Sequence, residues 1–126
     1  MRILIDTHIL IWHLEDNEKL SLDHSASITD PSNIVFISIA SFWEIAIKIS
    51  RSKLSISRSI EELIGAVERS NISILPIKPQ HTIQVSELTF HHKDPFDRMI
   101  IAQALVEDMP LISTDSDFTK YGVTLL

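Results

Sequence analysis

Residues 94–118 have the sequence DPFDRMIIAQALVEDMPLISTDSDF, which predicts a helix, then a buried strand, then the start of a short helix. Asp94 suits the N-cap of the first helix, and Pro95 suits its first position because proline has no N–H to lose there. The apolar residues of this helix form one buried stripe, made of Ile100, Ile101, Ala104 and Leu105. The strand follows at Leu111–Ser113, so this stretch predicts a helix–strand unit.

The same alternation of strands and helices continues through the rest of the chain. Further strands are expected at Arg2–Ile5, Asn33–Ile37, Ile72–Leu75 and Val123–Leu125. Further helices are expected at Ile9–Leu14, Ile39–Arg51, Ile60–Arg69 and His81–Leu88. Strands that alternate with helices indicate a parallel sheet covered on both faces. We therefore predict a three-layer α/β fold, with a central parallel sheet of four to five strands flanked by helices, in one domain spanning residues 1–126.

The bulk composition excludes several classes of protein. The 126 residues suffice for one domain with one buried core, and there is no cysteine for a disulfide, a thiol nucleophile or a zinc site. No run approaches the roughly 18–20 apolar residues of a membrane span, so we expect a cytoplasmic protein without membrane contact. Two glycines are too few for a Walker loop or a Rossmann fingerprint.

The charge balance leaves nucleic-acid binding open. A net charge of −6 argues against binding through the overall field of the protein. One stretch without acids, KISRSKLSISR at residues 48–58, nevertheless carries Lys48, Arg51, Lys53 and Arg58. This local group could grip a phosphate backbone, but cations also suit the C-terminal end of a helix.

Four acids lie where an expected strand or helix begins or ends: Asp6, Glu44, Asp97 and Asp115. Asp6 and Asp115 follow expected strands, and ligands of open parallel sheets bind beyond the carboxyl ends of the strands. Each acid alone has an ordinary explanation as a helix cap or a first-turn charge. Two carboxylates about 5 Å apart, however, repel by roughly 3 kcal/mol at an effective dielectric near 20. A converging set therefore predicts a hard divalent cation, Mg²⁺ or Mn²⁺.

Glu44 has a structural alternative. It follows Ser41 by three residues, which is the spacing of a capping box, although Ser38 directly follows a strand and is the better cap. Phe42, Trp43 and Ile45 surround Glu44, and a carboxylate buried there without a partner is costly. We expect a metal-centred site to supply that partner.

The order of these motifs resembles the PIN domain family, and more closely the VapC-type ribonuclease toxins of bacterial toxin–antitoxin pairs. The resemblance rests on four segments in sequence order: RILID at 2–6, SFWEIAIK at 41–48, DPFDRMIIAQAL at 94–105 and LISTDSDF at 111–118. It spans residues 3–126. It implies a PIN-like fold and an endoribonuclease that hydrolyses RNA phosphodiester bonds with Mg²⁺ or Mn²⁺.

The resemblance also implies which residues form the site. The catalytic acids would be Asp6, Glu44, Asp97 and Asp115, and the metal ligands would be Asp6, Asp97 and Asp115. Possible additional site residues are Asp94, Asp117, Thr7, Ser38 and Thr114. The candidates for RNA contact are Lys48 and Arg98, which fall on the family's pattern, together with Arg51 and Lys53 from the basic stretch. The spacing leaves open which of Asp115 and Asp117 caps the short helix and which faces the pocket.

Partners follow from the same resemblance. It implies a cognate antitoxin that covers the active site, and a homodimer. Trp12, Phe42 and Trp43 are candidates for apolar contact surfaces, although core packing explains at least two of the three.

Other interpretations keep part of the pattern. A receiver-like signalling domain also has an acidic Mg²⁺ pocket, but it would carry paired acids after the first strand, where this chain has Asp6-Thr7-His8. A phosphatase with an aspartyl nucleophile would need D-x-D at that point. A non-catalytic RNA- or protein-binding module would keep the fold with an eroded acid set. A zinc site is disfavoured because the histidines, including His91 and His92, show no strong ligand spacing.

Overall fold

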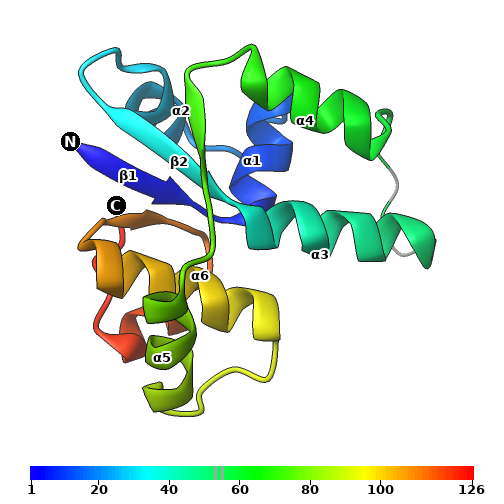
Figure 1. Cartoon of the computed structure of the whole chain (residues 1–126). Coiled ribbons are helices and arrows are strands. Elements are labelled where there is room, and N and C mark those ends of the chain that lie inside the picture. Colours follow the sequence, from blue (N-terminus) through cyan, green and yellow to red (C-terminus); the bar gives the residue numbers. More distant parts are fainter. Residues whose placement is uncertain (53, 55) are drawn as a thin grey trace.

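Four parallel strands form the centre of the molecule in the order β3-β2-β1-β4. A computed structural model of the chain describes residues 1–52, 54 and 56–126 (Figure 1). The strands are β1 Arg2–Ile5, β2 Ile34–Ser38, β3 Ile72–Leu75 and β4 Leu111–Ile112. Ile5 pairs with Ile37 on one side and with Ile112 on the other. The residues that follow these strands therefore emerge at the same edge of the sheet.

Helices cover both faces of the sheet, as predicted (Figure 1). One face carries α1 Thr7–Leu14, α2 Leu22–Thr29, α3 Ile39–Ser50 and α4 Ile60–Glu68. The other carries α5 Pro79–Glu87, α6 Pro95–Glu107 and the 3₁₀ helix η1 Ser116–Tyr121. No helix in the described part of the chain is long and apolar enough to cross a membrane.

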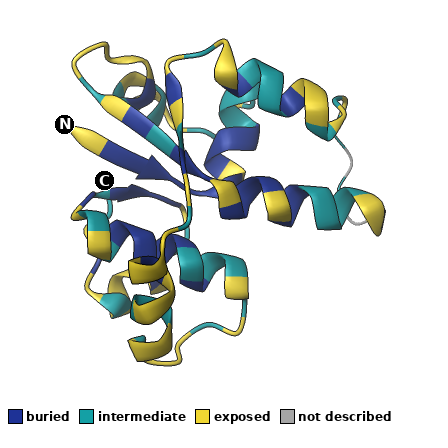
Figure 2. Ribbon diagram, viewed as in Figure 1, coloured by how far each residue is buried: buried dark blue, intermediate teal, exposed yellow. Residues whose placement is uncertain are grey.

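Each face of the sheet has its own apolar core, because successive side chains of a strand point to opposite faces. Ile3 and Ile5 pack toward α1–α4, whereas Leu4 between them packs toward α6. The strands and the inner sides of the helices are accordingly buried (Figure 2). This arrangement confirms the predicted three-layer α/β fold with a sheet of four parallel strands.

The helices that frame the sheet edge begin at the predicted caps. The Ser38 hydroxyl accepts from the Ala40 N–H at 3.0 Å and starts α3 directly after β2. Asp94 Oδ1 accepts from the N–H groups of Phe96 and Asp97 at 2.8 and 3.2 Å, and Pro95 occupies the first helical position. These caps fix where α3 and α6 begin, and therefore the positions of Glu44 in α3 and Asp97 in α6.

The structure departs from the expected secondary structure in two places. Helix α2 was not predicted, because Ile28 is its one buried residue and its sequence LDHSASIT has no apolar stripe. The strand expected at Val123–Leu125 is a single bridge between Leu125 and Leu111. Its partner β4 has two residues, so there is little edge for a longer strand to pair with. The other predicted elements are present, with bounds that differ by two residues or fewer.

Candidate active site

A pocket opens at the carboxyl edge of the sheet, between α1, α3, α6 and η1. Its lining residues are Asp6, His8, Glu44, Lys48, Asp94, Asp97, Thr114, Asp115 and Phe118. The four acids predicted to converge are all among them, although they come from four different parts of the chain. The volume of about 230 Å³ is several times the roughly 30 Å³ that one water occupies in the liquid, so a hydrated cation has room there.

Asp6 serves both as a helix cap and as a wall of the pocket. It connects β1 to α1, and its Oδ1 accepts from the Ile9 N–H at 3.0 Å. Burial raises the pKa of this carboxyl, and the nearby charge of Glu44 adds to the rise. A hydrogen bond from Ser113 partly offsets the rise in pKa. Asp6 therefore caps α1 and lines the pocket with the same side chain.

Glu44 is buried, with protein partners on both oxygens. The Thr7 hydroxyl donates to Oε1 at 2.7 Å and lies 2.9 Å from the hydroxyl of Ser41. The Lys48 ammonium, one turn along α3, donates to Oε2 at 2.7 Å, and this contact raises the pKa of Lys48. Thr7 and Lys48 thus supply partners for this buried carboxylate, so its burial alone does not require the metal-centred partner that we expected.

Asp97 is the acid with the least compensation. It lies half-buried in the first turn of α6, where its backbone N–H is bonded to Asp94. Burial, followed by the neighbouring charges of Asp94, Glu44 and Asp6, raises the pKa of its carboxyl to about 7. A carboxyl with so high a pKa favours either a proton or a nearby cation.

The structure shows which of Asp115 and Asp117 caps η1 and which lines the pocket. Asp115 Oδ1 accepts from the Asp117 N–H at 3.0 Å, and Asp115 thereby caps η1. It also lines the pocket, whereas Asp117 is exposed and pairs with Lys120 at 3.0 Å. One residue therefore does both jobs, and the prediction that they are divided between the two aspartates was wrong.

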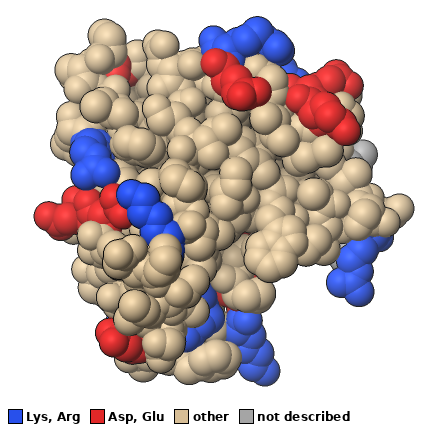
Figure 3. Space-filling view, in the orientation of Figure 1, with Lys and Arg blue, Asp and Glu red and all other residues tan. Residues whose placement is uncertain are grey.

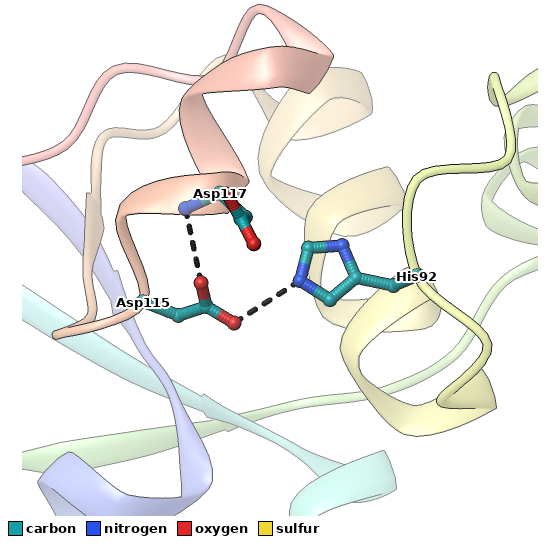
Figure 4. Close-up of side chains that lie close together, drawn as sticks. All are labelled: His92, Asp115 and Asp117. Atoms are coloured by element: carbon teal, nitrogen blue, oxygen red, sulfur yellow. Dashed lines mark hydrogen bonds and ion pairs between the residues drawn. The ribbon is translucent and has the colours of Figure 1, made fainter.

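Two overlapping sets of side chains could hold a metal ion. Asp6, Asp97 and Asp115 offer the carboxylate oxygens that Mg²⁺ and Mn²⁺ prefer. At the rim, His92, Asp115 and Asp117 offer ligand atoms that all lie within 4.8 Å of one another (Figure 4). The first set shares the pocket without reaching that spacing among the described residues. The oxygen donors of the first set fit a hard cation, whereas the imidazole of the second suits borderline metals.

Two neighbours of the acids were not predicted from the sequence. The Ser113 hydroxyl contacts Asp6 and accepts from the Asp115 N–H at 3.1 Å, whereas the predicted neighbour, Thr114, is exposed on the pocket wall. His92 is half-buried and lies 3.0 Å from Asp115 Oδ2. Neither has a local sequence signal, because both contacts join residues whose orientation depends on the folded edge of the sheet.

The described basic residues that were predicted to contact RNA lie in different environments. Lys48 lines the pocket and Arg51 is exposed at the end of α3, while Lys53 lies outside the described residues. Arg98 is buried, and its guanidinium donates to three backbone carbonyls, those of Val85, Leu88 and Thr89, at 3.1–3.3 Å. Its donors are thus directed to the end of α5 and the following loop, which argues against the predicted contact with RNA.

Comparison with known families and structures gives a consistent result. The family model described as PIN domain matches residues 3–123. The fold is similar to VapBC2 from Rickettsia felis bound to a promoter DNA fragment, with a TM-score of 0.74 and 16% identity, covering 100% of this chain and 98% of that chain. VapBC-1 from nontypeable Haemophilus influenzae gives a TM-score of 0.69 and 18% identity over 100% and 97% of the two chains.

A further similar structure is described as an endonuclease rather than as a toxin complex. The PIN domain endonuclease Utp24 gives a TM-score of 0.53 and 16% identity, covering 95% of this chain and 75% of that chain. No curated protein sequence matches this chain. At these identities the solved structures establish a shared fold, and the family assignment rests on the match to the family model.

Proposed function

The chain belongs to the PIN domain family, and from that premise we propose that it is a metal-dependent endoribonuclease toxin of the VapC type, neutralised by a cognate antitoxin. The observation that carries the proposal is the pocket in which four carboxylates from separate elements meet, with the pKa of Asp97 raised to about 7. The acid set is complete, which favours a nuclease over a non-catalytic binding module. Family membership excludes the receiver-like and phosphatase interpretations.

In the proposed site Asp6, Asp97 and Asp115 hold Mg²⁺ or Mn²⁺. The bound cation would lower the pKa of a water and neutralise charge on the scissile phosphate. The carboxylates of the pocket would hold that cation at the sheet edge, where Asp6 and Asp115 are fixed because each caps a helix. Asp94 is occupied as the cap of α6 and contributes mainly its charge.

Glu44 and Asp115 are the candidates to orient or deprotonate the attacking water. Thr7 and Lys48 hold the Glu44 carboxylate in one position, which suits a group that must align a nucleophile. In-line attack on the phosphodiester would leave a 5′-phosphate and a 3′-hydroxyl. Residues 1–126 act in this proposal as a single nuclease domain.

RNA binding in this proposal is local rather than global. Lys and Arg side chains on the face shown in Figure 3 lie in small groups interspersed with acids. Lys48 in the pocket wall and Arg51 at the end of the same helix are the nearest candidates for phosphate contacts. The net charge of −6 restricts RNA binding to such places.

A cognate antitoxin and a second copy of the chain are the proposed protein partners, and the cytoplasm is the proposed compartment. Solved structures with this fold include VapBC complexes, which supports an antitoxin partner. Of the three aromatic candidates for contact surfaces, Phe42 is buried and Trp12 packs against the core, as expected for at least two of them. Trp43 is exposed and rests edge-on against Phe96 with ring centroids 5.1 Å apart.

The proposal is tested by cleavage of a total RNA pool with purified, antitoxin-free protein. Wild type and the Asp6→Asn variant are compared with Mg²⁺, with Mn²⁺ and with EDTA. Discrete products that require metal and disappear in the variant would support the nuclease, and mapping of their ends would identify the target. Equal products from both proteins, or products that persist in EDTA, would contradict it.

A further inference from the structure

A chain of three hydrogen bonds connects the loop before α6 to Asp115. The backbone N–H of His91 donates to the Tyr121 hydroxyl oxygen at 3.1 Å. The same hydroxyl lies 3.0 Å from Nδ1 of His92. Nε2 of His92 lies 3.0 Å from Oδ2 of Asp115 (Figure 4). The pocket carboxylate is therefore linked, through an imidazole, to a tyrosine outside the pocket.

One arrangement of protons on a neutral imidazole satisfies all three contacts. Tyr121 accepts the His91 N–H, so its own O–H is free to donate to Nδ1 of His92. The proton of the imidazole is then on Nε2, where it is donated to Asp115. The opposite tautomer would place the Nε2 lone pair against a carboxylate oxygen, which is repulsive.

Packing holds the ring of His92 in this orientation. The ring meets Phe118 edge-on with centroids 5.2 Å apart and lies 5.4 Å from the ring of Tyr121. Its side chain is 13% exposed. The second oxygen of Asp115 accepts from the Asp117 N–H. The Asp115 carboxylate is thus fixed from both sides, by a backbone donor and by His92.

We propose that His92, oriented by Tyr121, is a positioning residue that fixes the Asp115 carboxylate for its role in the acid pocket, rather than a metal ligand. This inference rests on the proposed nuclease function and names a residue outside the acid set. A donor to a ligating carboxylate sets its orientation, and loss of such a partner typically weakens metal binding by about 10–100-fold. Asp117, the third member of the rim cluster, is engaged with Lys120.

The first test measures the tautomer and needs no activity. In ¹⁵N-labelled wild type, long-range ¹H–¹⁵N spectra should show His92 with an unprotonated Nδ1 and a protonated Nε2. Tyr121→Phe removes the hydroxyl donor and should shift His92 toward a mixture of tautomers. A wild-type His92 protonated on Nδ1 alone would overturn the proposal.

The second test compares neighbouring histidines. His91 contributes its backbone N–H to the chain, and its ring packs edge-on against Tyr121 with centroids 5.0 Å apart. His91→Ala therefore controls for lost packing beside Tyr121, without loss of the donor to Asp115. Mn²⁺ affinity, measured by titration calorimetry, should fall about tenfold in His92→Ala and less than about twofold in His91→Ala. In His92→Ala the kcat of RNA cleavage should fall while KM stays unchanged. His92→Gln, whose amide can donate to Asp115, should recover part of the loss.

The third test asks whether His92 binds the metal itself. Pulsed EPR of the Mn²⁺-loaded protein should show no strongly coupled nitrogen. A nitrogen coupling that His92→Ala abolishes would make His92 a ligand and overturn the proposal. Thermal unfolding of each variant should match wild type, because a global loss of folding would explain any deficit without positioning.

The outcomes separate this inference from the proposed function. If wild type binds Mn²⁺ and cleaves RNA, while His92→Ala behaves like His91→Ala, the nuclease stands and the role of His92 is wrong. If wild type neither binds Mn²⁺ nor cleaves RNA, the nuclease itself fails, and the positioning role fails with it even when the tautomer is as expected.

Discussion

The two ends of helix α6 carry acids in opposite environments. At its start, Asp97 lies among other carboxylates, and burial with their charges raises its pKa to about 7. At its end, Glu107 accepts from buried His81 at 2.9 Å and pairs with Arg2 at 3.5 Å, and the His81 hydrogen bond chiefly lowers its pKa. The charged form of an acidic side chain is therefore disfavoured at the start of α6, at Asp97, and favoured at its end, at Glu107.

This contrast separates chemistry from stability. The end that frames the sheet edge concentrates charge that the protein does not neutralise, as expected where a cation and a phosphate are to be bound. The other end uses a fully buried histidine, whose Nδ1 accepts from the Lys78 N–H at 2.9 Å, to join α5 to α6. Substitutions at the first end should therefore affect activity, and substitutions at the second should affect folding.

The largest expected effect is that of Asp97→Asn on RNA cleavage. The substitution keeps the shape of the side chain but removes the charge of one proposed metal ligand, so the rate should fall by about 10²–10³-fold or more. The metal-free protein should remain folded, because like-charge repulsion is removed. Gel-based cleavage kinetics with Mn²⁺ would measure the loss.

Asp108→Asn is the matched control for that prediction. Asp108 ends the same helix in the left-handed conformation, which asparagine also tolerates, and it is exposed. Its cleavage rate should equal that of wild type. If both variants lost comparable cleavage rates, activity would depend on any change of charge along α6. The contrast between the two ends of the helix would then be wrong.

The next effect is on stability, at the other end of the helix. His81→Ala deletes a buried ring with bonds to Lys78 and Glu107, and leaves the Lys78 N–H and the Glu107 carboxylate short of partners. The free energy of unfolding should fall by about 2–4 kcal/mol. Urea unfolding would measure it, with His91→Ala as the exposed counterpart. Full stability in His81→Ala would contradict the assignment of this end to folding.

Much of the site edge could be predicted from the sequence, because local signals mark it. Ser38, Asp94 and Pro95 define where two helices begin, and a buried strand precedes Asp6. Parallel topology then brings the ends of separate strands to one edge. These signals depend on neighbours in sequence, and the structure confirms the elements that they predict.

The contacts that could not be predicted depend on direction in three dimensions. Arg98 is adjacent to Asp97 in sequence, but successive helical residues lie about 100° apart around the axis, so Arg98 points toward α5. Ser113 rather than Thr114 contacts Asp6, and both residues follow the end of β4, so no strand periodicity indicates which of them meets Asp6. The Thr7 partner of Glu44 belongs to another helix, which no local spacing reveals.

The pH dependence of stability should have opposite signs for the two ends. Asp97 has a higher pKa in the folded protein, about 7, than its ordinary value of 3.8, so the folded state binds this proton more tightly. The contribution of Asp97 to the stability of the folded protein is complete below pH 4 and is lost as pH rises through 7. Glu107 has a lowered pKa, so its contribution is present above its ordinary value of 4.5 and is lost as pH falls.

Thermal unfolding of the metal-free protein between pH 4 and pH 8 would check this. Asp97→Asn should remove part of the decline toward pH 8, raising Tm there by roughly 4–8 °C, an amount already reduced for solvent screening of a half-buried group. Mn²⁺ should stabilise wild type most at high pH, where Asp97 is charged. If wild type and variant showed the same pH profile, Asp97 would not be the source of the decline in Tm toward pH 8.

The smallest expected effect distinguishes the two partners of Glu107. Arg2 lies 3.5 Å from this acid, but its side chain is 49% exposed, whereas His81 is fully buried. An exposed ion pair contributes at most about 1 kcal/mol and is weakened by salt. Arg2→Met keeps much of the packing over the Phe36 ring, whose centroid lies 5.5 Å from the guanidinium carbon. Urea unfolding should therefore show a loss of less than about 1 kcal/mol, which vanishes in high salt. A loss as large as that of His81→Ala would mean that charge pairing, rather than the buried hydrogen bond, stabilises this end of α6.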